Sequence, residues 1–140
     1  IGRLFPSERY QNLWYDASHN ADGIKTTMES LAGMGISNPI VIFGASNDKS
    51  LAHLSEFNEV IDAWYFCEFT NPRSYRGDHL MQVIDELKLK KTERFEQVNQ
   101  AINSALAHRK EHQAILVTGS FFLLSDCEEI QAKIKHQLTQ

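Results

Sequence analysis

The stretch PIVIFG at residues 39–44 decides the fold of this chain. It is a short run of β-branched and aromatic residues that ends at a glycine, and it lacks the polar alternation of a half-exposed strand. Two more runs have the same character, AWYFCEF at 63–69 and AILVTG at 114–119. Strands without polar alternation are buried on both faces, which is typical of a parallel sheet covered by helices.

Helical patterns alternate with these runs. The stretch LWYD at 13–16 is predicted as a strand, and the leading segment, with a turn at Pro6-Ser7, is predicted to pair with it as an antiparallel hairpin. A short, weaker strand is expected at 92–96. Helices are predicted at 24–33, 50–60, 78–87, 98–107 and 122–138, the first of them ended by Gly33 and Gly35. The pattern predicts a Rossmann-like α/β domain of three layers, a doubly wound, mostly parallel sheet of about six strands with one antiparallel edge strand.

Length and composition limit the class of protein. Residues 1–140 suffice for one domain, and the net charge of −4 without a basic block gives no indication of a nucleic-acid partner. Nothing approaches the roughly 20 apolar residues of a membrane span, so no membrane partner is expected. Cys67 and Cys127 lack metal-ligand spacing and suit reduced, buried thiols in a cytoplasmic protein. The chain opens on Ile1, which we interpret as the start of a piece of a longer protein.

Polar clusters follow the predicted strands. They are DASHN at 16–20, GASNDKS at 44–50, NPRSYR at 71–76 and TGSFF at 118–122. In an open parallel sheet these positions share the carboxyl edge, where ligands bind. We therefore expect a binding site along this edge.

Two interpretations remain open for the first cluster. Asn20 can cap the following helix or contact a ligand, and a cap contributes about 1 kcal/mol. Asp16 comes too early to be that cap, and a carboxylate there can accept two ribose hydroxyls or bind a metal through water. His19 alone would be a surface histidine, but beside Asp16 it can meet a phosphate or an acyl group.

The other clusters offer groups for anions. Lys49 is expected in the first turn of a helix. A cation there is destabilised by the helix dipole by about 0.3 kcal/mol unless it has an anionic partner. That partner is either Asp48 or a bound carboxylate or phosphate. Gly119 and Ser120 offer backbone N–H groups and a hydroxyl to an anion, or else form a glycine turn with a serine N-cap.

Several common motifs are absent. There is no GxGxxG after the first strand, which argues against NAD binding, and no GxxxxGK[ST], so this chain alone cannot cradle a nucleoside triphosphate. Neither a nucleophile elbow nor a plausible Ser-His-Asp order is present.

Taken together, five motifs resemble the C-terminal domain of folylpolyglutamate synthase/dihydrofolate synthase, in the Mur ligase superfamily. They are Gly2-Arg3 (a hinge "GR"), YDASHNADG ("DxAHNPxG"), VIFGASNDKS ("FGxxxDK"), FTNPRS ("NPR") and ILVTGSFFLLSD ("LVTGSFFLV"). They occur in family order over almost the whole chain. Two positions depart from the pattern, since Ala21 replaces a proline and Ser18 an alanine.

The resemblance implies an ATP-dependent amide ligase. Such an enzyme phosphorylates the carboxylate of folate or dihydropteroate, and the amine of L-glutamate then displaces phosphate from the acyl phosphate. The P-loop and most ligands of Mg²⁺ would belong to the protein's own N-terminal domain, outside this chain. The fragment alone is therefore expected to be inactive.

The resemblance also implies roles for particular residues. Arg3 would reach the ATP phosphates, Asp16 the ribose, with Asn20 beside it, and His19 the transferring phosphate. Lys49 and Ser120 would receive the incoming glutamate. Arg73 and Phe121 are further candidates for the same pocket, and Phe121 is equally compatible with a place in the core. No residue is expected to ligate a metal directly. The alternatives are a peptidoglycan-precursor or cyanophycin-type ligase domain and a non-catalytic Rossmann-like binding domain.

Overall fold

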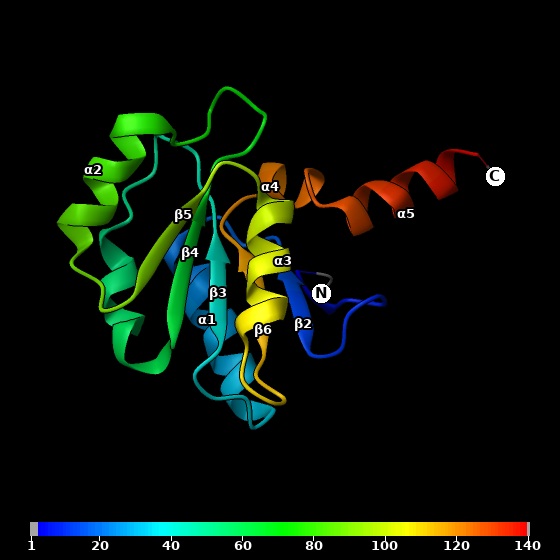
Figure 1. Cartoon of the computed structure of the whole chain (residues 1–140), viewed down its shortest axis with the longest axis horizontal. Coiled ribbons are helices and arrows are strands. Elements are labelled where there is room, and N and C mark those ends of the chain that lie inside the picture. Colours follow the sequence, from blue (N-terminus) through cyan, green and yellow to red (C-terminus); the bar gives the residue numbers. More distant parts are fainter. Residues whose placement is uncertain (1–2, 140) are drawn as a thin grey trace.

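The sheet organises the molecule. The computed structural model describes residues 3–139, and within them a mixed sheet of six strands has the order β1-β2-β6-β3-β4-β5 (Figure 1). The strands are β1 (Leu4–Pro6), β2 (Leu13–Asp16), β3 (Ile40–Phe43), β4 (Ala63–Cys67), β5 (Thr92–Phe95) and β6 (Ile115–Thr118). β1 pairs antiparallel with β2, and the pairings of β2 through β5 are parallel. The predicted sheet and its antiparallel edge strand are confirmed.

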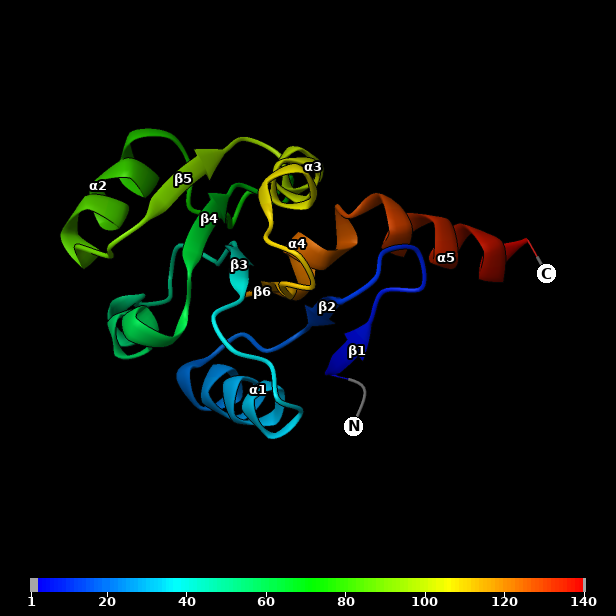
Figure 2. The same ribbon diagram turned by 60° about the horizontal axis from the view of Figure 1, so that its bottom comes forward.

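Helices cover both faces of this sheet, as predicted. Their bounds are α1 (Ala21–Gly33), the 3₁₀ helix η1 (Ala52–Val60), α2 (Gly77–Leu87), α3 (Val98–His108), α4 (Phe121–Ser125) and α5 (Glu128–Leu138). α1, η1 and α2 pack against one face, and α3 and α4 pack against the other (Figure 2). α5 extends from this second layer away from the body of the molecule (Figure 1).

Alternate side chains of the central strands enter two separate cores. Ile40 and Ile42 of β3 pack in the core under α3, whereas Val41 and Phe43 pack in the core under α1 and η1. All residues of β3, β4 and β6 are buried. Each large apolar side chain removed from water contributes about 1.5–3 kcal/mol, so apolar residues are required on both faces of these strands. This explains the uninterrupted apolar runs in the sequence.

The C-terminal segment corrects one prediction, because the single helix expected at 122–138 is divided into α4 and α5. Cys127, with ψ of 131°, is extended and separates the two helices. Tertiary hydrogen bonds stabilise the break. The Thr70 N–H donates to Asp126 Oδ2 at 2.7 Å, and the Glu128 N–H donates to Asn99 Oδ1 at 3.0 Å.

The segment at 50–60 corrects a second prediction. It forms the 3₁₀ helix η1, which begins at Ala52, and Leu51 is its N-cap. A 3₁₀ helix has three residues per turn, so side chains three positions apart lie on one face. Leu51 and Leu54 are buried at this spacing, and Phe57 packs against the same core. The three-residue spacing thus suits the tighter helix.

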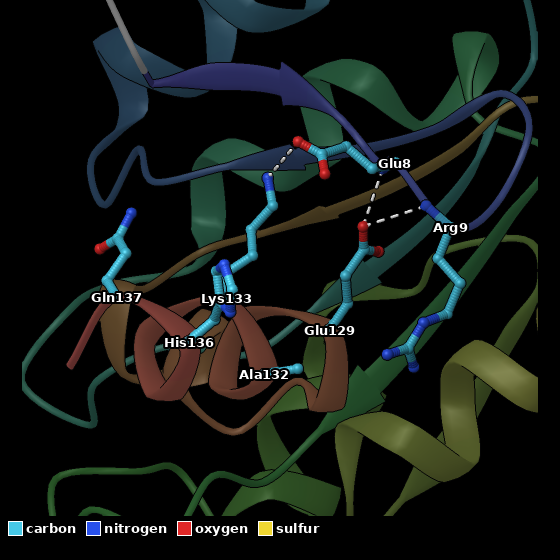
Figure 3. A pocket seen from close by; sticks show the side chains of 7 residues that line it. All are labelled: Glu8, Arg9, Glu129, Ala132, Lys133, His136 and Gln137. Carbon is cyan, nitrogen blue, oxygen red and sulfur yellow. Dashed lines mark hydrogen bonds and ion pairs between the residues drawn. The ribbon is translucent and has the colours of Figure 1, made fainter. Parts of the chain in front are cut away.

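Glu129 attaches α5 to the β1–β2 turn. Its carboxylate accepts from Ser7 Oγ at 2.6 Å, from Tyr15 Oη at 2.8 Å, and from the Glu8 and Arg9 N–H groups at 2.8 and 3.1 Å. Figure 3 shows this carboxylate between α5 and the turn, with Lys133 paired to Glu8 beside it. A hollow of about 530 Å³ lies here, away from the carboxyl ends of β2, β6 and β3. The Glu129 carboxylate is already engaged by the turn, so we assign no ligand to this hollow.

The strand order brings distant parts of the chain together. β6 is last in the sequence but lies between β2 and β3, where the direction of winding reverses. Ligands bind at such a reversal, beyond the carboxyl ends of the strands. None of the helices within residues 3–139 has the length and apolar character needed to cross a membrane.

Candidate functional site at the carboxyl edge of the sheet

Three loops meet at the reversal point. They are residues 17–20 after β2, 119–120 after β6 and 44–51 after β3. Thr118 pairs in register with Phe43, and Val117 with Tyr15, so the three strands end at nearly the same level. The loop 68–76 after β4 lies next to them. The polar clusters singled out in the sequence therefore share one edge.

Asp16 lies beneath this edge rather than on its surface. The residue is 0% exposed. Its Oδ1 accepts from Ser18 Oγ at 2.9 Å, and its Oδ2 accepts from Thr118 Oγ1 at 2.7 Å. A direct contact with a ribose, as implied by the family resemblance, requires the carboxylate to become accessible and to exchange one of these bonds.

The 17–20 loop exposes His19 and Asn20. The Asn20 side chain accepts from the Gly23 N–H at 2.9 Å and is the N-cap of α1, so the predicted cap is present and a ligand contact of this residue stays a prediction. The Arg3 carbonyl accepts from the Ala17 N–H at 2.9 Å. These contacts place the start of β1 beside the loop.

Arg3 and α1 border a hollow of about 560 Å³. Its lining includes Arg3, Ser18, Asp22, Gly23, Thr26 and Thr27. The Arg3 guanidinium lies over the first turn of α1, since a Cβ built on Gly23 would be 3.1 Å from Nη1. A guanidinium beside a helix N-terminus offers positive potential to an anion. Gly2, the other half of the "GR" motif, lies outside the described residues.

The loop after β6 passes very close to the end of β3. Gly119 has φ of 119°, and a Cβ there would lie 2.3 Å from the Gly44 carbonyl oxygen. Ser120 is buried and caps α4, accepting from the Phe122 N–H at 3.0 Å. Phe121 is 63% exposed and is therefore no part of the core. The aromatic ring is thus available at the same edge as the loops.

Lys49 corrects the helix assignment made from the sequence. It lies in the loop before η1, so the argument that its charge opposes a helix dipole does not apply. Its side chain is exposed, while its carbonyl accepts a hydrogen bond from the buried Tyr75 hydroxyl. The position of Lys49 is therefore set by the loop rather than by a helix.

The loops after β3 and β4 form one unit. The Asn47 N–H donates to the Arg73 carbonyl at 2.6 Å, and the Tyr75 N–H donates to the Ala45 carbonyl at 3.0 Å. The Arg76 guanidinium donates to the Phe69 and Asn71 carbonyls at 3.1 and 2.9 Å. Lys49 and Arg73 are thus exposed cations on two loops held against each other.

The cysteines and the carboxylates do not gather into a cluster of metal-binding side chains within residues 3–139. No group of three or more His, Cys, Asp or Glu side chains is placed there to hold a metal ion. Cys67 and Cys127 are buried free thiols, as expected. Burial raises the pKa of both, that of Cys127 to about 12, so neither thiol is a nucleophile at neutral pH.

The structure reveals contacts of two residues in these polar clusters to which the sequence assigned no individual role. Thr118 and Tyr75 bind Asp16 and the carbonyl of Lys49, respectively. Thr118 was noticeable only as a hydroxyl at the end of an apolar strand. Ser18 was noticed as a departure from a motif, and its hydroxyl is bonded to Asp16.

Comparison with known proteins gives a consistent picture. Residues 3–121 match the family model described as "Mur ligase, glutamate ligase domain". The chain is 28% identical over 120 residues to the dihydrofolate synthase/folylpolyglutamate synthase of Escherichia coli, covering 83% of this chain and 27% of that protein. It is 30% identical over 127 residues to the UDP-N-acetylmuramoyl-L-alanyl-D-glutamate–2,6-diaminopimelate ligase of Caldanaerobacter subterraneus subsp. tengcongensis, covering 84% of this chain and 26% of that protein.

A solved structure shares the fold. It is the bifunctional folylpolyglutamate synthase/dihydrofolate synthase of Yersinia pestis complexed with AMPPNP and Mn ion, with a TM-score of 0.68 at 21% identity. The match covers 97% of this chain and 31% of that one. The chain thus spans about a quarter of the length of the two curated relatives.

Proposed function

This chain belongs to the Mur ligase glutamate ligase domain family, and we propose that it is the C-terminal domain of an ATP-dependent ligase that adds L-glutamate to folate or dihydropteroate. The observation that supports this proposal is that the loops after β3, β4 and β6, which carry Lys49, Arg73, Ser120 and Phe121, follow neighbouring parallel strands at one edge of the sheet. The identity to the Escherichia coli dihydrofolate synthase/folylpolyglutamate synthase supports the folate substrate.

We assign the two sides of this edge to the two small substrates. Arg3, His19 and Asn20 lie on the side of β2 and face the nucleotide, where the guanidinium stabilises charge on the phosphates. Lys49 pairs with a carboxylate of the incoming amino acid, Arg73 adds a second positive charge, and the Ser120 hydroxyl donates to the same ligand. The exposed ring of Phe121 covers the ligand's methylene groups.

The proposed reaction has two steps. A carboxylate oxygen of the acceptor attacks the terminal phosphorus of ATP, ADP leaves, and an acyl phosphate forms. The amine of glutamate then attacks the acyl carbon, phosphate leaves, and the amine loses its proton as the amide forms. The residues named above hold the amine close to the acyl carbon, and such positioning contributes about 7–11 kcal/mol in well-oriented systems.

Mg²⁺ and the P-loop are assigned to an N-terminal domain of the complete ligase. Within residues 3–139, no three of the possible metal-binding side chains come together. In this proposal the metal would neutralise phosphate charge from the other side of the cleft. The Yersinia pestis enzyme of similar fold was solved in complex with AMPPNP and Mn ion, which supports the proposal that the complete ligase uses a nucleotide and a divalent cation.

A peptidoglycan-precursor ligase is the second candidate. The 30% identity to a 2,6-diaminopimelate ligase favours this candidate. Diaminopimelate, like glutamate, carries two carboxylates that could pair with Lys49 and Arg73. A non-catalytic Rossmann-like binding domain is the alternative of a different class. Lys49 and Arg73 suit glutamate and diaminopimelate equally well. Activity assays with each amino acid therefore distinguish the two ligases.

The test uses the complete ligase and the variant Lys49→Ala. We expect KM for the amino acid to rise at least about tenfold, because removing one partner of a charged pair costs about 1.5–3 kcal/mol, while KM for ATP changes little. Lys135→Ala, an exposed lysine on α5, is the matched control and should behave as the wild type. Assays with L-glutamate and with diaminopimelate identify the substrate. An unchanged KM for the amino acid in Lys49→Ala would remove Lys49 from the site.

A further inference from the structure

A buried polar network joins the two sides of the proposed cleft. Asp16, Ser18, Thr27 and Thr118 are each at most 4% exposed. Thr118 Oγ1 donates to one oxygen of Asp16 at 2.7 Å and Ser18 Oγ donates to the other at 2.9 Å, while Ser18 and Thr27 hydroxyls lie 3.5 Å apart. The network therefore runs from the end of β6, through the end of β2, to α1.

The two oxygens of Asp16 serve different segments. Oδ1 is bonded within the loop 17–20, which carries His19 and Asn20. Oδ2 is bonded to Thr118, the residue directly before Gly119 and Ser120. A buried carboxylate is costly unless it is hydrogen-bonded, so both donors are held in place. Asp16 consequently fixes the loop on the nucleotide side relative to the segment on the amino-acid side.

We propose that Thr118 is a positioning residue of the ligase reaction, acting through Asp16 to keep the loop 17–20 in register with Gly119 and Ser120. This inference rests on the proposed function. Thr118 is buried and touches neither substrate, and its effect is transmitted by one hydrogen bond. Ser18, which replaces the alanine of the family pattern, provides the second donor that holds Asp16 in this orientation.

Because the network lies between the two proposed binding sites, its loss should affect both substrates. If the Thr118 hydroxyl is lost, Asp16 Oδ2 loses its donor from β6, and the 17–20 loop is no longer fixed to the strand that leads into Ser120. The acyl phosphate and the attacking amine are then less well aligned. A misplacement of about 1 Å can cost about a hundredfold in rate.

Kinetics of the complete ligase carrying Thr118→Val and Thr118→Ser test this inference. For Thr118→Val we expect kcat to fall about tenfold or more, with changed KM values for both ATP and the amino acid, whereas Thr118→Ser, which keeps the hydroxyl, stays within about twofold. Thr92→Val, in the edge strand β5, is the matched control. A Thr118→Val enzyme that melts at a lower temperature but keeps the wild-type kcat and KM would show a purely structural role and overturn the proposal.

A double variant separates action through Asp16 from an independent effect. If Thr118 acts through Asp16, the variant Asp16→Ala/Thr118→Val is no slower than Asp16→Ala alone, because the partner of the hydroxyl is already gone. If the double variant instead loses kcat by the product of the two single-variant losses, the two residues act independently and the proposal is contradicted.

A measurement on the 140-residue chain distinguishes failure of this inference from failure of the proposed function. In amide NMR spectra, Thr118→Val should shift signals of both 17–20 and 119–121. Shifts confined to the neighbours of Thr118 would overturn the inference whether or not the enzyme is a ligase. A wild-type ligase without ATP-dependent activity would instead refute the proposed function.

Discussion

Glu129 is a buried carboxylate that holds the C-terminal helix on the rest of the molecule. Burial is the largest single influence on it and opposes its charge, but hydrogen bonds from Ser7, Tyr15 and the backbone N–H groups of Glu8 and Arg9 outweigh burial. The pKa of Glu129 consequently lies below its ordinary value of 4.5. Burial, followed by the bond to Glu129, raises the pKa of the Tyr15 hydroxyl, which remains a donor to this carboxylate.

The lowered pKa of Glu129 contributes to the dependence of stability on pH. Because the folded form of Glu129 binds its proton more weakly than the unfolded form, its contribution is complete above about pH 4.5 and is lost as the pH falls through the folded pKa. We expect the free energy of unfolding, measured by urea titration, to fall on acidification below that pH as the contribution of this group is lost.

Glu129→Gln isolates the contribution of this one group. The amide cannot ionise and presents an NH₂ group to donors, so the variant should be about 1–3 kcal/mol less stable at pH 7 and should lose less stability on acidification. Glu128→Gln, at the exposed neighbouring position, is the control. Asp62, whose pKa is lowered chiefly by a hydrogen bond from Gln113, titrates in both proteins and cancels in the comparison. Identical pH dependence in Glu129→Gln and the wild type would refute this account.

The polar residues of the carboxyl edge could be identified from the sequence, but their hydrogen-bond partners in other strands could not. Asn20 and Ser120 were recognised as caps or ligands, and the hydrogen bonds show that each caps a helix, while the ligand role of each stays a prediction. The bond from Thr118 to Asp16 could not be predicted, because the two residues are 102 positions apart and meet only through the strand order. Local patterns predict caps because cap and helix are adjacent in the chain, and they cannot predict contacts between strands.

Elements were predicted well where burial alone determines them. The apolar runs of β3, β4 and β6 require a strand covered on both faces. The division between α4 and α5 was missed because Asp126 and Cys127 are compatible with a helix. Two hydrogen bonds with distant parts of the chain stabilise the break: the Thr70 N–H donates to the Asp126 side chain, and the Glu128 N–H donates to the Asn99 side chain.

The turn between β6 and α4 provides a sharp test at the scale of elements. Gly119→Ala places a Cβ at a positive φ and 2.3 Å from the Gly44 carbonyl oxygen, so the strand ends must move apart. We expect a loss of about 2 kcal/mol or more in the free energy of unfolding, since backbone strain costs about 1–3 kcal/mol even without a clash.

Gly33→Ala is the matched control for this substitution. Gly33 ends α1, and a Cβ there would have no neighbour within 4 Å. Because alanine is favoured over glycine in a helix, this variant should be neutral or about 0.5–1 kcal/mol more stable. Chemical denaturation of both variants measures the difference. Equal stabilities for Gly119→Ala and Gly33→Ala would show that the close approach at Gly44 is relieved without cost.

At the scale of the whole molecule, the order of the strands is the feature that the sequence left undetermined. Periodicity predicts which segments are strands, whereas the order depends on how the connecting helices pack. Here β6 inserts between β2 and β3 after α3 crosses the face opposite to α1. This insertion creates the reversal point and brings residues 16–20, 44–50 and 118–121 to one place.

The same order predicts where the molecule opens first. β3, β4 and β6 are flanked by strands on both sides and fully buried, whereas β1 and β5 lie at the edges and are half-exposed. Amides in the central strands should exchange hydrogen only by global unfolding, and those of β1 and β5 by local opening at least about tenfold faster. Exchange followed by NMR on the whole chain, corrected for intrinsic rates, measures this difference. Protection in β5 equal to that in β4 would mean that the edge strand and the central sheet unfold as one unit.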